Sequence, residues 1–316
     1  MLEPVFNDLS VEPLAADLAA AFERMSRLIE LLRVAPDYGL ASGLRIPQAF
    51  HSLTLCPKYR IWDWLNDARV PREQIVFLLA LATSSPFLDH TPDAIQERAL
   101  LVDLRVGGLA SDALRAAYLL EAPLLSFMEA PWDTAFIGCE CEELVDDRLT
   151  PSRPVHLPNL AEVPHFAIHA EWIQGRKRRS IASTRDLWDR RDKLFPHLDF
   201  CLSVEDQLMR LRFSEPRFQQ VVSKLFDLER YFAGWVTGGF DPGAFTKCNP
   251  ASRETLARYS EDYLYLTADA LQVVANWHLY LTPGKGRLYF EADATRRRGI
   301  VCHVGNKLPD TTYGRT

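Results

Sequence analysis

Three runs near the end of the chain alternate in the way typical of β-strands: LQVVANWHLYL (271–281), RLYFE (287–291) and GIVCHVG (299–305). Successive side chains of a strand point to opposite faces, so each run divides into two rows. One row is apolar and includes Leu279, Leu281, Leu288, Phe290, Ile300, Cys302 and Val304. The other row collects His278, Tyr280, Arg287, Tyr289 and His303. We therefore predict an antiparallel sheet with one face packed on helices and the other meeting water or a ligand.

The preceding sequence favours helices. Apolar residues recur every three or four positions over 13–34, which is typical of an amphipathic helix. Further helices are expected over 71–82, 91–106, 111–120, 184–193, 202–211, 215–235 and 251–259. Prolines and histidines crowd 150–170, which we interpret as a connection between domains. The fold class expected is α+β: a mostly helical domain over 1–160, then a domain over 161–316 with helices packed on a small antiparallel sheet.

Charge is distributed unevenly. Residues 1–150 contain 12 Lys and Arg against 23 Asp and Glu, whereas residues 151–316 contain 24 against 19. An acidic first half and a basic second half indicate different partners. The basic half is the one expected to meet a polyanion such as RNA, and the acidic half is expected to bind a protein.

Several classes of function are disfavoured. The sequence contains no phosphate-binding GxxxxGK[ST] loop, no GxGxxG after a strand, no GxSxG elbow and no kinase motifs, so we expect no nucleotide cofactor. No apolar stretch approaches the roughly 20 residues that cross a bilayer, and the acidic start does not resemble a signal peptide. We expect a cytoplasmic protein without a membrane partner.

The polar row of the sheet carries the chemistry of a metal-independent ribonuclease. Such an enzyme needs a base for the 2′-hydroxyl, cations around the phosphate and an acid for the leaving oxygen. His278 and His303 are candidates for base and acid, and Arg287 for binding the phosphate. Tyr289 is a candidate for stacking on a base or donating a proton. The alternative is that these residues form the hydrated face of an ordinary sheet.

Other basic residues are candidates for contacts with the nucleic-acid backbone. They are Lys285, Arg296, Arg297, Arg298 and Lys307 around the strands, and the run Arg176, Lys177, Arg178 and Arg179. The run is interpreted either as a phosphate contact or as an exposed, solvated loop.

The strings GKGRLYF (284–290) and GIVCHVGNKLPDTT (299–312), after helices and on successive strands, resemble the RelE/HigB group of toxin-like ribonucleases. The resemblance covers about residues 215–316. Arg287 and Tyr289 match an arginine–tyrosine strand of that group, and Lys307 matches its lysine-rich tail, where Asn306 stands in place of a second basic residue. It implies that these residues contact or act on RNA in the ribosome, as part of a toxin–antitoxin or phage-defence system in bacteria.

Two weaker patterns concern metals. Cys139 and Cys141 are separated by one residue, and His165 and His169 by three. Neither comes with a full ligand set, so we expect no metal. As an alternative to a ribonuclease, the chain is a non-catalytic subunit of a bacterial multi-protein system, which binds protein through its acidic half and protein or nucleic acid through the sheet.

Overall fold

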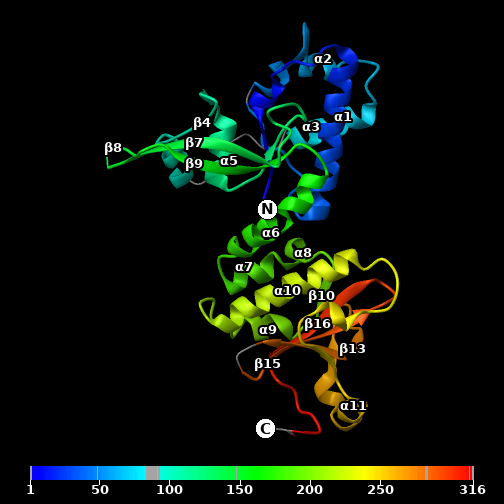
Figure 1. Cartoon of the computed structure of the whole chain (residues 1–316). Helices are drawn as coiled ribbons and strands as arrows, with labels where there is room; N and C mark the ends of the chain where they lie inside the picture. The colour runs from blue at the N-terminus through cyan, green and yellow to red at the C-terminus, as the bar shows by residue number, and fades with distance from the viewer. Residues whose placement is uncertain are drawn as a thin grey trace. The chain divides into compact units, whose positions relative to one another are not determined.

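A computed structural model describes residues 2–47, 49–82, 91, 93–146, 148–281, 284–312 and 314. The chain forms two compact units, Met1–Arg176 and Lys177–Thr316 (Figure 1). The division expected after residue 160 therefore lies within the first unit. No helix in the described part of the chain is long and apolar enough to cross a membrane.

The first unit contains most of the short strands. Its helices are α1 (Leu18–Val34), α2 (Ile61–Leu65), α3 (Arg72–Ala82), α4 (Asp93–Ala99), α5 (Asp112–Leu120) and α6 (Pro164–Arg179), which runs three residues past the division. Its strands are β1 (Val5–Phe6), β2 (Thr54–Cys56), β3 (Tyr59–Arg60), β4 (Val102–Val106), β5 (Leu109–Ala110), β6 (Leu124–Leu125), β7 (Phe136–Val145), β8 (Arg148–Leu149) and β9 (Arg153–Leu160).

The expectation of a mostly helical first domain is wrong. Seven strands form a mixed sheet in the order β1-β6-β9-β7-β4-β5, with β8 paired to β7. Strands β1, β6 and β9 run parallel to one another, and the remaining pairs are antiparallel. The helix expected over 91–106 ends at Ala99, and its second half is β4; Pro92 lies outside the described residues. The fold class is therefore mixed α/β.

Prolines explain why β9 looked like a connection between domains. Pro154 and Pro158 pair with β7, but the pairing of β9 with β6 involves only Asn159 and Leu160. The prolines thus occupy the part of β9 that has a single neighbour, where a missing amide donor costs no ladder hydrogen bond. Of residues 150–170, which were expected to connect two domains, Arg153–Leu160 form β9 of the sheet and the residues from Pro164 onward belong to α6.

The second unit contains α7 (Thr184–Asp189), α8 (Arg191–Leu194), α9 (Val204–Met209), α10 (Pro216–Gly234) and α11 (Arg253–Arg258). Its strands are β10 (Leu198–Phe200), β11 (Cys248–Pro250), β12 (Leu264–Leu266), β13 (Gln272–Val274), β14 (Trp277–Leu281), β15 (Gly286–Asp293) and β16 (Arg298–Asn306). The run expected as one strand over 271–281 is divided, because β13 pairs with β12 in a separate sheet.

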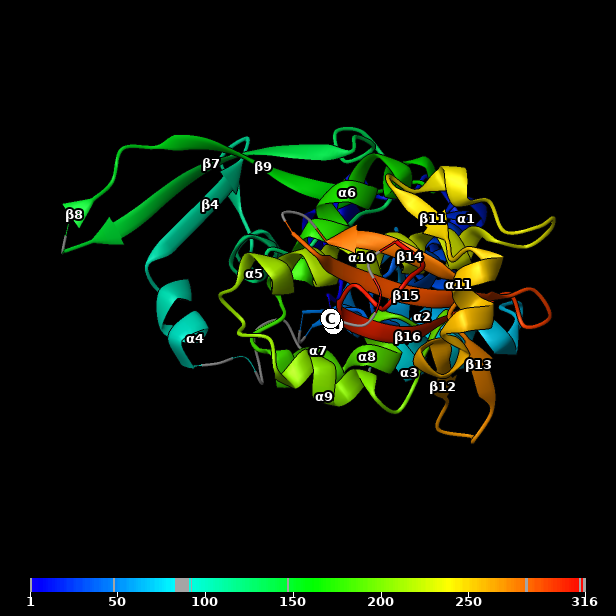
Figure 2. The ribbon, with the colours of Figure 1, turned by 90° about the horizontal axis from the view of Figure 1, so that it is seen from below.

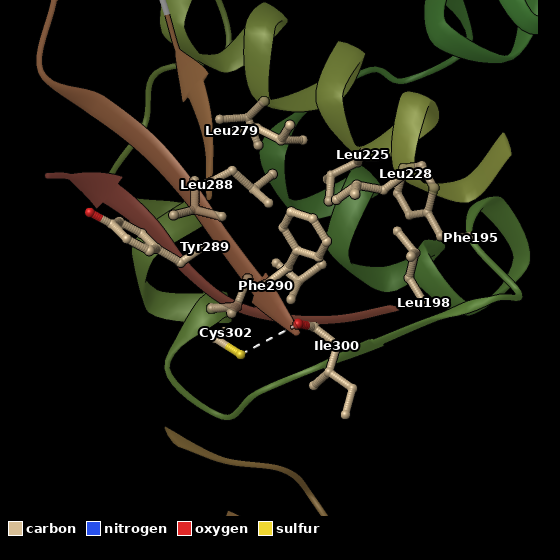
Figure 3. Close-up of a cluster of buried hydrophobic side chains, with 14 of the residues drawn as sticks. Phe195, Leu198, Leu225, Leu228, Leu279, Leu288, Tyr289, Phe290, Ile300 and Cys302 are labelled. Atoms are coloured by element: carbon tan, nitrogen blue, oxygen red, sulfur yellow. Dashed lines mark hydrogen bonds between the residues drawn. The ribbon is translucent and has the colours of Figure 1, made fainter. Parts of the chain in front are cut away.

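The sheet of the second unit is larger than expected and is mixed rather than antiparallel. Its order is β10-β16-β15-β14-β11, with β10 parallel to β16. Figure 2 shows β11, β14, β15 and β16 of this sheet. Helix α10 packs across β14, β15 and β16 on one face. Leu225 and Leu228 of α10 face Leu288 and Phe290 there, whereas Tyr289 leaves β15 on the opposite side (Figure 3).

A β-bulge changes the face of two residues in β16. His303 pairs with Tyr289, but Val301 pairs with Phe290, so that Cys302 is an extra residue. Val301 therefore shares a face with Phe290, and Ile300 lies opposite Glu291. The faces expected for Ile300 and Val301, before the bulge, are therefore wrong, whereas those expected for His303 and Val304, after it, are correct.

Candidate functional site

The register of the sheet brings the predicted polar residues together in two rows. His278, Tyr289 and His303 are direct partners across β14, β15 and β16, and Tyr280 is the partner of Arg287 in the next row. The ring of Tyr289 lies 5.2 Å from that of His278 and 5.7 Å from that of His303. Three strands therefore form one cluster of histidine, tyrosine and arginine on the face away from α10.

The part of this face around Tyr289 is covered by protein, whereas His278, Tyr280 and His303 are half-buried. The backbone amide of Leu308, just after β16, donates to Tyr289 Oη at 2.9 Å. The hydroxyl of Tyr263, from the 3₁₀ helix η5 (Ser260–Tyr263), donates to the carbonyl oxygen of Pro309 at 3.1 Å. Tyr289 is consequently only 1% exposed, and burial raises the pKa of its hydroxyl. We name Lys307–Asp310 the tail segment.

His303 is held by hydrogen bonds at both ring nitrogens. The side-chain amide of Gln207, in α9, donates to Nδ1 at 2.9 Å, and Nε2 lies 3.3 Å from the carbonyl oxygen of Asn306. Gln207 also accepts the backbone amide of Val304 through Oε1, so its amide orientation follows from this network. Burial lowers the pKa of His303. His303 thus has hydrogen-bond partners at both ring nitrogens, and Tyr289 Oη accepts a backbone amide, so both side chains help to hold the structure.

His278 differs from His303 because its Nδ1 is buried and has no hydrogen-bond partner among the described residues. Burial, with further contributions from the positive charges of Arg287 and Lys307, lowers its pKa to about 4. Asp310 opposes this effect. At neutral pH the imidazole is therefore uncharged and able to accept a proton.

Arg287 is the second group with an unused polar atom. It is 8% exposed, and its guanidinium group lies 3.7 Å from the centroid of the Tyr280 ring. Its Nη1 donates to the carbonyl oxygen of Gly286 at 2.7 Å, whereas its Nε is buried without a partner among the described residues. A buried donor without an acceptor costs about 1–3 kcal/mol, and such groups in native proteins commonly meet a water or a ligand.

Two of the predicted lysines lie at the same end of the sheet. Lys285 is exposed in the turn before β15, and its carbonyl oxygen accepts the amide of Lys307 at 2.8 Å. The Lys307 side chain forms an ion pair with Asp310 within the tail segment. Both ammonium groups therefore belong to segments that border Arg287.

The predicted arginines 296–298 lie at the opposite end of the hairpin. Arg287 and Asp293 are six residues apart on β15, which places the β15–β16 turn about 20 Å away along the strand. Arg296 and Arg298 form ion pairs with Asp199. Arg297 lies 4.8 Å above the ring of Trp235. These three residues are not part of the His278 cluster.

The basic run belongs to a helix and is not a loop. Arg176 to Arg179 form the last turn of α6, where positive side chains interact favourably with the helix dipole. Arg176 forms an ion pair with Glu121, and Arg178 lies over the ring of Phe226. Burial lowers the pKa of Lys177. The first three residues of the run, 176–178, are therefore half-buried against other parts of the protein, and Arg179 is the exposed member.

The residues considered for metal binding are used in other ways. His169 donates through Nε2 to the carbonyl oxygen of Ala135 at 2.7 Å, and His165 Nδ1 accepts the amide of Ala161. Cys139 and Cys141 are buried on one face of β7. Within the described residues, no group of three or more His, Cys, Asp and Glu side chains is placed to hold a metal ion.

No family model matches the chain, and neither a curated protein nor a solved structure matches it. The resemblance to the RelE/HigB group therefore stays a prediction that rests on the quoted strings. Of the residues described here, Gln207 and the part of the tail segment after Lys307, Leu308–Asp310, were missed at the sequence level. An isolated glutamine in a helix carries no signal of its own, and strand alternation does not reveal which segment covers a polar face.

Proposed function

We propose that the second unit binds RNA at His278 and Arg287 and cleaves it without a metal ion. The observation that carries this proposal is the pair of buried, unpartnered atoms on neighbouring rows of the sheet, Nδ1 of His278 and Nε of Arg287. A phosphodiester supplies acceptors for the guanidinium group, and its 2′-hydroxyl supplies a proton for a neutral imidazole. The protein would then act in the cytoplasm as a toxin-like or host-defence ribonuclease, on free RNA or in the ribosome.

The proposed reaction uses His278 as the base. Its imidazole takes the proton of the 2′-hydroxyl while the 2′ oxygen forms a bond to phosphorus. The bond from phosphorus to the 5′ oxygen breaks, and this oxygen takes a proton from water. The hydroxide that remains takes the proton from the His278 imidazolium and restores the neutral base. The products are a 2′,3′-cyclic phosphate and a free 5′-hydroxyl. Arg287, with Lys307 nearby, offsets the negative charge that gathers on the phosphate oxygens.

The test is cleavage of end-labelled RNA by the full chain in excess EDTA, with and without ribosomes. We expect cleavage that His278→Gln slows by about 10²–10⁴-fold, the usual contribution of a general base. Arg287→Lys keeps the charge but loses the planar donor, and it should bind RNA more weakly. His156→Gln, at an exposed position of β9, is the matched control and should cleave normally. Intact RNA in every reaction, or unchanged cleavage by a folded His278→Gln protein, would contradict the proposal.

A non-catalytic role in binding a protein is the second candidate, and exposed apolar side chains of the first unit favour it. Leu144 and Leu149 are partners in the β7–β8 pair, and they are 39% and 64% exposed. Val145, next to Leu144, is 51% exposed. A pull-down from native extract, with absorbance at 260 nm recorded on the eluate, separates the two candidates. A stoichiometric protein partner that is lost in Leu149→Asp, without nucleic acid, favours the second.

A further inference from the structure

A separate cavity of about 550 Å³ lies in the second unit, beside β10 and the start of β16. Its wall includes Trp188, Phe200, Asp199, Thr267, Arg296 and Arg298. This volume falls within the roughly 300–1,000 Å³ of typical small-molecule sites. Neither His278 nor Arg287 lines the cavity, so it is distinct from the proposed RNA site.

Part of the wall is aromatic. The rings of Trp188 and Phe200 meet edge to face at 5.8 Å, and Phe200 also contacts the buried ring of Phe195. Trp188 and Phe200 are only partly buried, so they offer apolar surface to a ligand. The guanidinium group of Arg191 lies 4.2 Å from the Trp188 ring and restricts the movement of that ring. Such surfaces favour a flat, aromatic ligand.

The polar part of the wall centres on Asp199. Arg298 donates to Asp199 Oδ1 through Nε at 3.1 Å and Nη2 at 2.7 Å. The other oxygen, Oδ2, lies 3.2 Å from Arg296 Nη1, yet it is buried and accepts no hydrogen bond from the described residues. Two arginines thus fix the carboxylate while one of its oxygens is left to accept from a ligand.

The charge of the wall indicates what kind of ligand fits. Three guanidinium groups and four carboxylates line the cavity among the described residues. Both arginines next to Asp199 already have carboxylate partners, since Arg296 also pairs with Asp293. The cavity therefore offers no excess of positive charge to an anion, and it favours a neutral ligand that donates N–H groups.

We propose that this cavity binds a nucleobase, whose flat ring packs against Trp188 and whose N–H groups donate to Asp199. The base belongs either to a free nucleoside or to an unpaired position of a nucleic-acid strand. Both sources present the same ring edge and face.

The test is calorimetric titration of the full chain with adenosine, guanosine, cytidine and uridine, with their 5′-monophosphates, and with single-stranded RNA hexamers. We expect at least one nucleoside to bind, and its monophosphate to bind more weakly because of the carboxylates. Tighter binding of the hexamer containing that base identifies a strand as the source, and binding of the nucleoside alone identifies the free compound.

Variants connect the binding to the cavity. Asp199→Asn removes the charge from the acceptor and should weaken binding by about ten- to a hundredfold, the range of a hydrogen bond to a charged group. Trp188→Ala should also weaken it, whereas Trp62→Ala, at an exposed position in α2, should not. Thermal unfolding verifies that each variant folds, and Trp188→Ala provides the test if Asp199→Asn does not.

Three results would overturn the inference: no nucleoside or hexamer binds, Trp188→Ala binds as the wild type does, or a monophosphate binds best and Asp199→Asn strengthens it. His278→Gln should leave nucleoside binding unchanged. The proposal of a nucleobase site in the cavity and the proposal of a ribonuclease site can therefore be confirmed or refuted independently of each other.

Discussion

His278 should remain uncharged well below the pH at which an exposed histidine takes up a proton. Its pKa is lowered from 6.5 to about 4 by burial, Arg287 and Lys307. At 1.36 kcal/mol per pH unit, this difference corresponds to about 3 kcal/mol, and the partial exposure of the ring reduces it to about 2 kcal/mol. Between pH 6.5 and 4 the unfolded chain binds a proton that the folded protein does not, so stability falls as the pH decreases.

Comparison with His278→Gln isolates this contribution from those of His303 and His169, whose pKa values are also lowered. In urea unfolding of the second unit, followed by tryptophan fluorescence, the wild type should lose about 2 kcal/mol more than the variant between pH 7.5 and 4.5. Proton NMR of the imidazole should give a midpoint near 4 directly. A midpoint close to 6.5, with equal loss of stability in both proteins, would refute the reasoning.

Two further substitutions test the packing around the site. Gln207→Ala removes the amide that holds His303 and a strand amide of β16, and it should lower the free energy of unfolding by about 1–3 kcal/mol in urea titrations, without changing that of the first unit. Gly299→Ala would place a Cβ 2.3 Å from Phe232 Cε2 and 2.8 Å from Leu198 Cδ2, so these buried side chains must move, and we expect a loss of about 1–3 kcal/mol in the same assay. Gly138→Ala in β7, where a Cβ meets nothing within 4 Å, is its control and should leave this transition unchanged.

The second unit was easier to predict from sequence than the first. The alternation of RLYFE and the second half of LQVVANWHLYL located β15 and β14, and with them the neighbouring positions of His278, Arg287 and Tyr289. These strands pair with sequence neighbours across short connections, so local patterns carry the information. The strand β10 pairs in parallel with β16, about a hundred residues later in the chain. A run of three residues carries no sequence signal that would identify so distant a partner strand.

The first unit was misjudged because its strands lack the usual composition. Strand β7 alternates buried Ile137, Cys139 and Cys141 with exposed Gly138 and Glu140. The period of two is present, but glycine and glutamate are depleted in strands and hide it. In β9 the prolines hid the strand in the same way. Tertiary pairing outweighed weak local preference in both cases.

The surroundings of His278 connect its pKa with its proposed role. In the free protein, burial, together with the charges of Arg287 and Lys307, lowers the pKa of the imidazole and keeps it neutral, which is the form that can accept a proton. A phosphodiester beside Arg287 brings a negative charge, which raises the pKa of His278 back toward neutral pH. Binding of RNA would thus make His278 a stronger base at the step in which it accepts the proton of the 2′-hydroxyl. A purely structural histidine in this position would gain nothing from the two neighbouring cations, which make its protonated form less stable.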